Sequence, residues 1–164
     1  WSVGVIYSKK HTHKSNNIAL NLFYQFSISS SIQFVLAILF SSNNDNWRTP
    51  RTVYQMLDSE FNFNFDPCPK LPKFDGLSIS GGTINFVNPP YSQIKFWIKK
   101  GYEEALKGKT VVFLIPSRTD TKWWHEYCMK ANEIRFIKGR LKFEGAKHSA
   151  PFPSCIVIFK GVSK

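Results

Sequence analysis

Apolar residues recur along the chain at two spacings, and from residue 45 onward segments of the two kinds follow each other in turn. Residues three and four apart share one face of a helix, whereas every second residue shares one face of a strand. The first spacing predicts three helices. The first starts with Thr49 as N-cap and Pro50 as its first helical residue. The second covers Ile94–Leu106 and is stopped by Gly108, and the third covers Lys122–Lys130. The second spacing and short apolar runs predict strands at Phe61–Phe65, Thr83–Val87, Val111–Ile115, Glu133–Ile137 and Cys155–Phe159.

Helices and strands that alternate in this way are typical of an α/β fold with a mostly parallel sheet. The last two predicted strands are joined by a turn-rich stretch, so we expect them to form an antiparallel edge. In Phe61–Phe65 the phenylalanines alternate with Asn62 and Asn64, which predicts a strand with one face in water at an edge of the sheet.

The first 44 residues differ from the rest in composition. No charged residue stands between Lys14 and Asp45, and Ser, Asn and Gln interrupt the apolar residues. The best apolar run, Ile32–Phe40, is shorter than the roughly 20 residues that span a bilayer. A targeting role is the alternative, but no tidy small-residue cleavage site follows. We expect residues 1–44 to be a tail that is disordered or not native to the protein, and the folded domain to cover residues 45–164.

Charge and cysteine content narrow the class of partner. The chain has 22 Lys and Arg against 11 Asp and Glu, a net charge of +11, which favours a polyanionic partner. Cys68, Cys128 and Cys155 are widely spaced without a C-x-x-C pair, so we expect neither a disulfide framework nor a zinc site. His125 and His148 show no metal-binding or acid–base spacing. A reducing compartment, the cytoplasm, is the simplest location.

The residues that point to chemistry are Asn88, Pro89, Pro90 and Tyr91, which follow a predicted strand and precede a predicted helix. Open α/β sheets bind ligands outside the carboxyl ends of their strands. An aromatic exocyclic amine is a poor nucleophile, and the Asn88 side-chain oxygen and the Pro89 carbonyl are suitable acceptors for its two N–H bonds. The two prolines stiffen the loop, and Tyr91 offers a flat face on which a base can stack. The alternative is a proline-rich loop that ends a strand for steric reasons alone.

Several motifs together resemble the small, phage-type Dam-like DNA adenine-N6 methyltransferases. Asn88–Tyr91 reads as the catalytic tetrapeptide of amino-methyltransferases, and the resemblance runs from about Trp47 to Lys160. The other segments that stand in the family's order are Trp47–Pro50, Phe65–Cys68, Asp75–Leu77, Pro116–Trp124 and Gly139–Phe143.

The resemblance implies a truncated Rossmann-like, S-adenosylmethionine-dependent methyltransferase fold, with residues 45–164 as the catalytic domain. It implies S-adenosylmethionine as methyl donor and DNA as partner, with the target adenine flipped out of a duplex because its amine lies on the Watson–Crick edge. It also implies a bacterial or phage-infected cell, and we expect no membrane partner and no metal.

The resemblance also assigns roles to individual residues. On the cofactor side it places Trp47, Thr49, Pro50, Asp66, Pro67, Cys68 and Asp75. On the substrate side it places Arg118, Arg140 and Phe143, with Phe152 as a second candidate to cover the flipped base. The bland alternatives are a helix cap for Thr49, an Asp-Gly turn for Asp75 and a solvated surface residue for Arg118.

The sequence departs from the family pattern in two respects. The loop after Asp66 lacks a G-x-G, and only 21 residues separate Asp66 from Asn88, too few for two further strand–helix units. We therefore expect the two strands that usually complete such a sheet to be absent or elsewhere. The alternatives that stay open are an RNA adenine or protein glutamine methyltransferase and an inactive nucleic-acid-binding remnant.

Overall fold

The computed structural model describes residues 47–71 and 73–161, which belong to the second of two compact units, Asn43–Lys164. The expectations for residues 1–44 lie outside the described residues. In chain order the elements, with η for 3₁₀ helices, are α2 (Arg51–Phe61), β1 (Ile84–Val87), η1 (Tyr91–Gln93), α3 (Ile94–Leu106), β2 (Thr110–Pro116), α4 (Lys122–Glu126), η2 (Cys128–Lys130), β3 (Glu133–Phe136) and β4 (Ser154–Phe159).

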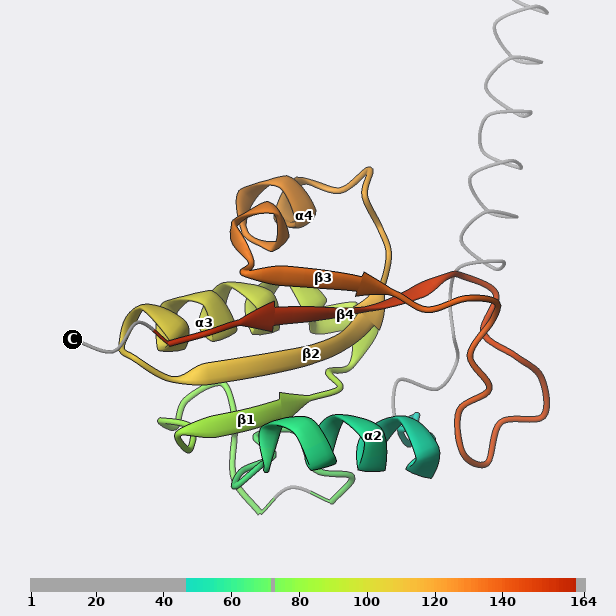
Figure 1. Ribbon diagram of the computed structural model, residues 1–164, viewed down its shortest axis with the longest axis horizontal. Coiled ribbons are helices and arrows are strands. Elements are labelled where there is room, and N and C mark those ends of the chain that lie inside the picture. The colour runs from blue at the N-terminus through green and yellow to red at the C-terminus, as the bar shows by residue number, and fades with distance from the viewer. Residues whose placement is uncertain (1–46, 72, 162–164) are drawn as a thin grey trace, which may run out of the picture. The chain divides into compact units, whose positions relative to one another are not determined.

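The strands form one four-stranded mixed sheet in the order β1-β2-β4-β3 (Figure 1). β1 and β2 pair in parallel, whereas β4 pairs antiparallel with both β2 and β3. β1, β2 and β3 therefore share one direction, and only β4 runs against them. The α/β class and the antiparallel pairing of the last two strands are confirmed, but most of the ladder pairing is antiparallel.

The antiparallel strand does not lie at the edge, which corrects the sequence-based expectation. β4 is buried along its whole length, as an interior strand requires, whereas β3 is the edge strand. The β3 sequence carries Glu133 and Arg135, and charged side chains are a common protection of a sheet edge. The last two strands do lie together at one edge, as expected, but the antiparallel one is the inner of the two.

Each face of the sheet has its own apolar cluster, because successive residues of a buried strand point to opposite faces. Val111 and Phe113 of β2 belong to the cluster that includes α3, α4 and η2, and α3 lies behind the sheet in Figure 1. Val112 and Leu114 belong to the cluster that includes α2 and the segment after β3. Gly101 lets α3 approach closely, since a Cβ there would come within 2.3 Å of the Phe113 ring.

The predicted strand Phe61–Phe65 is wrong except at its end. Phe61 is the last residue of α2, and Asn62 stops the helix in the left-handed conformation with φ 54°. Asn64 bonds to the start of β1 through its main chain and side chain, and Phe65 forms a single parallel bridge to Asn85. Asn62 ends the helix, and Asn64 forms hydrogen bonds that hold the loop against β1. Neither asparagine belongs to a solvent-exposed strand face.

The other predicted elements are found with small shifts. α3 has the predicted bounds, and Gly108 follows it with φ 91°. The predicted helix Lys122–Lys130 is divided, because α4 ends at Glu126 and a separate 3₁₀ turn, η2, follows. No strand occurs among the described residues between Phe65 and Ile84, as the short spacing predicted.

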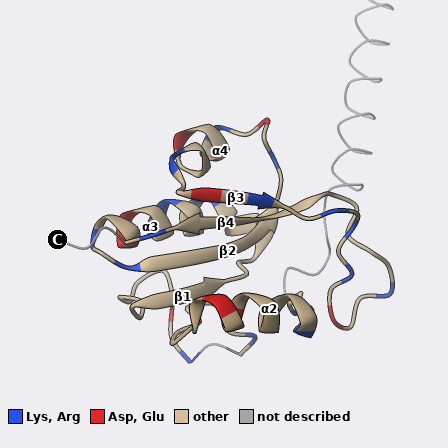
Figure 2. Ribbon diagram, in the orientation of Figure 1, with Lys and Arg blue, Asp and Glu red and all other residues tan. Residues whose placement is uncertain are grey.

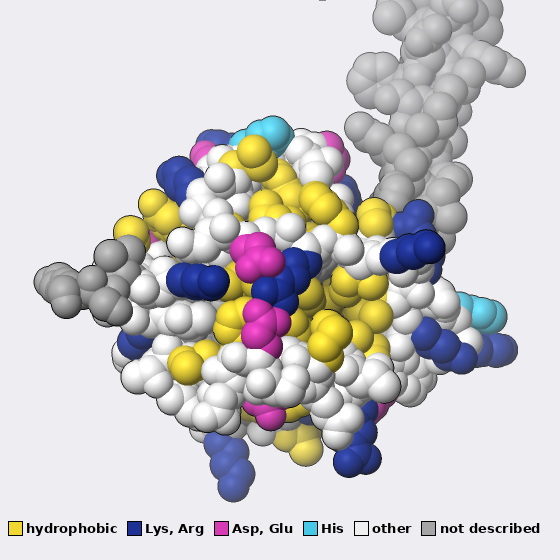
Figure 3. Space-filling model, viewed as in Figure 1, with side chains coloured by type: hydrophobic (Ala, Val, Ile, Leu, Met, Phe, Trp, Pro, Cys, Tyr) yellow, Lys and Arg dark blue, Asp and Glu magenta, His cyan; other side chains and the backbone are white. Residues whose placement is uncertain are grey.

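An ion cluster joins α2 to the edge strand. Arg135 of β3 donates to both carboxylate oxygens of Glu60, each at 2.6 Å, and to Glu133 of its own strand at 2.6 Å. Figure 3 shows acidic side chains beside a basic one near the middle of this face, with apolar side chains around them. This cluster attaches the carboxyl-terminal end of α2 to β3.

A second ion cluster surrounds Glu104, which is 5% exposed at the carboxyl-terminal end of α3. Its carboxylate accepts from Lys107 at 2.9 Å and from Lys109, which also donates to the Gly81 carbonyl at 2.8 Å. Burial alone would raise the pKa of Glu104, but the hydrogen bonds from Lys109 and Lys107 outweigh it and lower the pKa to about 2. Glu104 therefore ties α3 to the loop before β1.

We expect Glu104→Gln to reduce the free energy of unfolding at pH 7 by about 3 kcal/mol, because it removes the buried carboxylate that pairs with Lys107 and with the largely buried Lys109. A depressed pKa stabilises the fold above the unfolded-state pKa, so the loss should shrink as the pH falls from about 4.5 towards about 2. Urea unfolding of both proteins across this range measures the effect. The matched control is Glu103→Gln, whose pair with Lys99 is exposed and should matter little. A difference that does not depend on pH would contradict this account.

Candidate active site at the carboxyl ends of the strands

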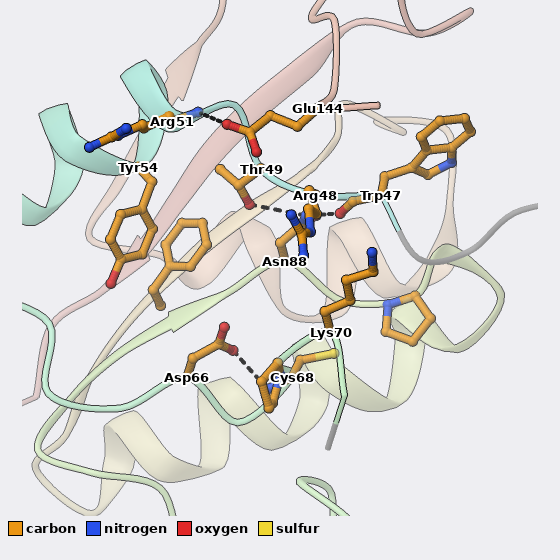
Figure 4. A pocket seen from close by; sticks show the side chains of 13 residues that line it. Trp47, Arg48, Thr49, Arg51, Tyr54, Asp66, Cys68, Lys70, Asn88 and Glu144 are labelled. Carbon is orange, nitrogen blue, oxygen red and sulfur yellow. Dashed lines mark hydrogen bonds between the residues drawn. The ribbon is translucent and has the colours of Figure 1, made fainter. Parts of the chain in front are cut away.

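A pocket of about 430 Å³ lies where β1 and the Phe65 bridge end. Because Phe65 and Asn85 are paired in parallel, the residues after them, Asp66 and Asn88, lead to the same edge of the sheet. Figure 4 shows both side chains directed into this region together with residues that precede and begin α2. The lining residues are Trp47, Arg48, Thr49, Arg51, Tyr54, Asp66, Cys68, Pro69, Lys70, Phe86, Asn88, Pro90 and Glu144.

The Asn88 side chain is held in one orientation by two acceptors. Its Nδ2 donates to the Trp47 carbonyl at 2.8 Å and to the Thr49 hydroxyl at 3.1 Å (Figure 4). Both N–H bonds of the amide are thereby used, so the other end, Oδ1, is left to accept. None of the described residues donates to Oδ1. Pro89, directly after Asn88, is buried and fixes the backbone of the loop.

Thr49 does not cap α2, which corrects the sequence-based expectation. Pro50 is the N-cap, and no side chain of the N-cap bonds to the helix. The N–H of Arg51 instead donates to Glu144 Oε1 at 2.9 Å, and Glu144 N donates to the Arg48 carbonyl at 3.0 Å. A carboxylate at a helix N-terminus is stabilising, and this one frees the Thr49 hydroxyl for Asn88.

Asp66 and Cys68 form the lower side of the pocket in Figure 4. Asp66 Oδ1 accepts from the Cys68 N–H at 2.8 Å. Burial raises the pKa of the Asp66 carboxyl, and this hydrogen bond opposes the rise. Burial, and then the charge of Asp66, raise the pKa of the Cys68 thiol to about 12. The thiol is therefore neutral at pH 7, which does not suit a covalent nucleophile.

Aromatic side chains make up the rest of the wall. Tyr54 on the inner face of α2 meets Phe86 of β1 edge to face, with ring centroids 5.1 Å apart. Trp47 packs against Phe143 at 6.2 Å. The pocket thus joins an apolar wall to a few fixed polar groups, the usual composition of a site for a small organic ligand.

Tyr91 belongs to an aromatic cluster beside the pocket and is not one of its lining residues. Its ring meets Phe152 at 5.3 Å and Phe143 at 6.3 Å, both edge to face. Its hydroxyl is buried and has no hydrogen-bond partner among the described residues, and burial raises its pKa. The packing of this ring depends on its aromatic body and not on its hydroxyl.

Comparison with known proteins identifies the family. Residues 78–162, more than half of the chain, match the family model described as DNA N-6-adenine-methyltransferase (Dam). The chain belongs to this family. The Dam match covers β1, the Asn88–Tyr91 loop and all later elements of the sheet.

A phage protein supports the same assignment. The DNA N-6-adenine-methyltransferase of Haemophilus phage HP1 (strain HP1c1) is 30% identical over 110 residues. The alignment takes in 58% of this chain and 64% of the phage protein, so the chain spans less than two thirds of this relative's length.

The structure brings together only part of the residue set expected from the Dam-like motifs. The expected residues that line the pocket are Trp47, Thr49, Asp66, Cys68, Asn88 and Pro90. The expected residues that do not line it are Pro50, Pro67, Asp75, Pro89, Tyr91, Arg118, Arg140 and Phe143.

Three of the Dam-like residues outside the pocket have other surroundings. Asp75 is exposed and forms the Asp-Gly turn. Hydrogen bonds from the Ser78 hydroxyl and then from the Leu77 N–H lower the pKa of its carboxyl. Arg118 follows β2 and pairs with Asp120 at 3.4 Å. Phe143 is 3% exposed and packs beneath the pocket.

The pocket also contains residues that the Dam-like motifs did not indicate. Tyr54 lies one helical turn after Pro50 on the inner face of α2, and its spacing from Leu57 was a usable signal. Glu144 stands 93 residues after Arg51, and no spacing rule predicts such a contact. Within the described part of the Dam-family chain, no helix is long and apolar enough to cross a membrane, and no group of His, Cys, Asp or Glu side chains is placed to hold a metal ion.

Proposed function

We propose that the protein transfers a methyl group from S-adenosylmethionine to the exocyclic amine of adenine in DNA. The observation that carries the proposal is the orientation of Asn88, whose Nδ2 is bound on both N–H bonds while Oδ1 is left as an acceptor. Membership of the Dam family and the position of Asn88 at the carboxyl end of β1 support the same reaction.

The pocket residues fit S-adenosylmethionine. A volume of about 430 Å³ lies in the range of small-molecule sites. The donor carries a sulfonium and an ammonium, and Asp66 offers a carboxylate whose charged form a nearby cation would favour. Tyr54 and Phe86 offer aromatic faces that suit an organic cation. When bound, the donor supplies an electrophilic methyl group, and Trp47, Asp66 and Cys68 are the residues that would hold it.

The work of the protein is to orient the amine. The lone pair of an aromatic amine is delocalised into the ring, and two acceptors aimed at its N–H bonds draw the nitrogen towards a tetrahedral shape. Asn88 Oδ1 and the Pro89 carbonyl are these acceptors. Pro89 and Pro90 hold them in place before the substrate binds, so that little reorganisation is needed during the reaction. Tyr91 covers one face of the flipped base. Phe152, which is half-buried whereas Phe143 is only 3% exposed, covers the other, and Arg118 and Arg140 contact the DNA.

We further propose that the sheet is a truncated Rossmann-like methyltransferase sheet and that residues 45–164 form the catalytic domain. The support is that β1, β2 and β3 run in one direction, that β4 is inserted antiparallel between β2 and β3, and that the bridge at Phe65 lies on the outer side of β1. The cytoplasmic location stays a prediction.

Incubation with labelled S-adenosylmethionine and separate DNA, RNA and protein acceptors tests the reaction class. We expect label in DNA alone. Label in RNA or in protein glutamine would support the corresponding alternative, which the same planar-amine chemistry allows. Donor binding without transfer to any acceptor, or no donor binding, would support an inactive remnant.

Thr49 gives a more specific prediction. Thr49→Val removes one acceptor of Asn88 Nδ2 and keeps the side-chain shape, so we expect kcat to fall about fivefold, the value of one neutral hydrogen bond. The KM for the donor should not change, and Thr49→Ser should restore kcat. Steady-state kinetics of both variants measure this. A raised donor KM with normal kcat would instead identify Thr49 as a cofactor contact.

A further inference from the structure

Three basic side chains of the pocket lining have no role in the proposed chemistry. Arg48 precedes α2, Arg51 is its first residue, and Lys70 lies in the loop after Asp66. All three are exposed, although each lines the pocket, so they form its rim and not its floor. Figure 4 shows Arg48 over Asn88, Lys70 to one side of it, and Arg51 at the start of α2. We call these three residues the basic rim.

The charge of the basic rim is not neutralised within the described part of the chain. None of the three side chains has a carboxylate within ion-pair distance there, whereas some basic residues elsewhere do, as in the Arg135–Glu60 and Lys107–Glu104 pairs. The pocket contains two carboxyl groups. Glu144 is bound to the N–H of Arg51, and burial raises the pKa of Asp66.

The position of these cations indicates which kind of anion they meet. The floor of the pocket carries Asn88 and the aromatic wall, while the cations stand at the opening. With the methyl donor in the pocket, a nucleotide whose base reaches Asn88 from the opening leaves its sugar and its two flanking phosphates outside, beside these cations. Figure 2 shows further basic residues in the loop after β3, at the same end of the sheet as the start of α2.

We propose that Arg48, Arg51 and Lys70 bind the backbone phosphates on either side of the nucleotide whose base reaches Asn88. The proposal rests on the proposed function, since it requires a nucleic-acid substrate. Contacts to phosphate fix the position of the protein on the duplex and carry no sequence information. The basic rim therefore contributes affinity and register, and the choice of recognition sequence lies with other groups.

The test is the salt dependence of DNA binding. The slope of log Kobs against log salt concentration is negative. We expect its magnitude to decrease by about 0.9 for each of Arg48→Gln, Arg51→Gln and Lys70→Gln, and by about 2 to 3 for the triple variant. The change should be the same on two duplexes of different sequence. Fluorescence anisotropy of labelled duplexes from low to moderate salt gives these slopes, and titration calorimetry gives the affinity for S-adenosylmethionine, which should stay unchanged.

Lys99→Gln on α3 is the matched control, because it removes the same charge from an exposed side chain away from the pocket. Rim variants with the slope of Lys99→Gln would overturn the proposal. So would rim variants that lose donor affinity and keep the DNA slope, because the cations would then bind the cofactor carboxylate. A wild-type protein that methylates no DNA would instead remove the proposed function, which a separate labelled-donor assay on the wild type decides.

Discussion

Asn88→Ala is expected to lower the rate of methyl transfer by about 10² to 10³, the usual loss when one fixed polar group at a reacting centre is removed. The alanine has no acceptor for the target amine. The fold should survive, because the substitution removes only two hydrogen bonds, to the Trp47 carbonyl and the Thr49 hydroxyl. Single-turnover kinetics with saturating donor and DNA measure the effect, and circular dichroism and donor affinity serve as controls.

Asn88→Asp tests the acceptor oxygen separately from the two hydrogen bonds that Asn88 Nδ2 donates. The carboxylate keeps acceptor oxygens but cannot donate to Trp47 O and Thr49 Oγ1, so we expect turnover between that of the wild type and that of Asn88→Ala. Near-normal transfer by a folded Asn88→Ala protein would remove Asn88 from the mechanism.

Tyr91→Ala is expected to have the second largest effect, a loss of roughly 5- to 150-fold in turnover, since base–aromatic stacking is worth about 1–3 kcal/mol. Tyr91→Phe should be nearly silent in turnover and should not lower the melting temperature, because the hydroxyl has no partner among the described residues. The ring also packs against Phe143 and Phe152, so Tyr91→Ala will destabilise the fold as well.

Two comparisons isolate the stacking contribution from the packing contribution. Tyr91→Leu fills much of the volume without a flat ring, and it should keep most of the stability while losing turnover. The defect should also shrink when the target adenine stands opposite a mismatch, because unpairing then costs less. Equal losses of melting temperature and donor affinity, with no effect of the mismatch, would show that Tyr91 only packs. A strong turnover defect in a stable Tyr91→Phe protein would show that the hydroxyl matters.

Elements with one dominant pattern were predictable from the sequence. α3 has apolar residues at helical spacing and a glycine, Gly108, two residues after its last residue, and both bounds were correct. Phe61–Phe65 was misread because its asparagines serve a helix end and a loop, and a period of two does not distinguish these roles from a strand. An antiparallel strand was expected at the edge, but the sequence does not show that the last strand inserts between two earlier ones.

The site was predictable as far as local motifs reach. Asn88, Thr49 and Asp66 were indicated by motifs, and the structure places them on one pocket. The function of Thr49 as a partner of Asn88 was not predictable, since it depends on Glu144 to replace it at the start of α2. Contacts between residues so far apart in the chain follow from the packing of the whole domain.

The most direct test of the central claim is analysis of the nucleosides of DNA treated with the protein. Unmethylated plasmid is incubated with the wild type and labelled S-adenosylmethionine, digested, and separated by liquid chromatography with mass detection. We expect label in N6-methyl-2′-deoxyadenosine and in no other nucleoside, and we expect this label to be lost with Asn88→Ala. Label in a methylated cytosine, or DNA without label while the protein binds the donor, would contradict the account.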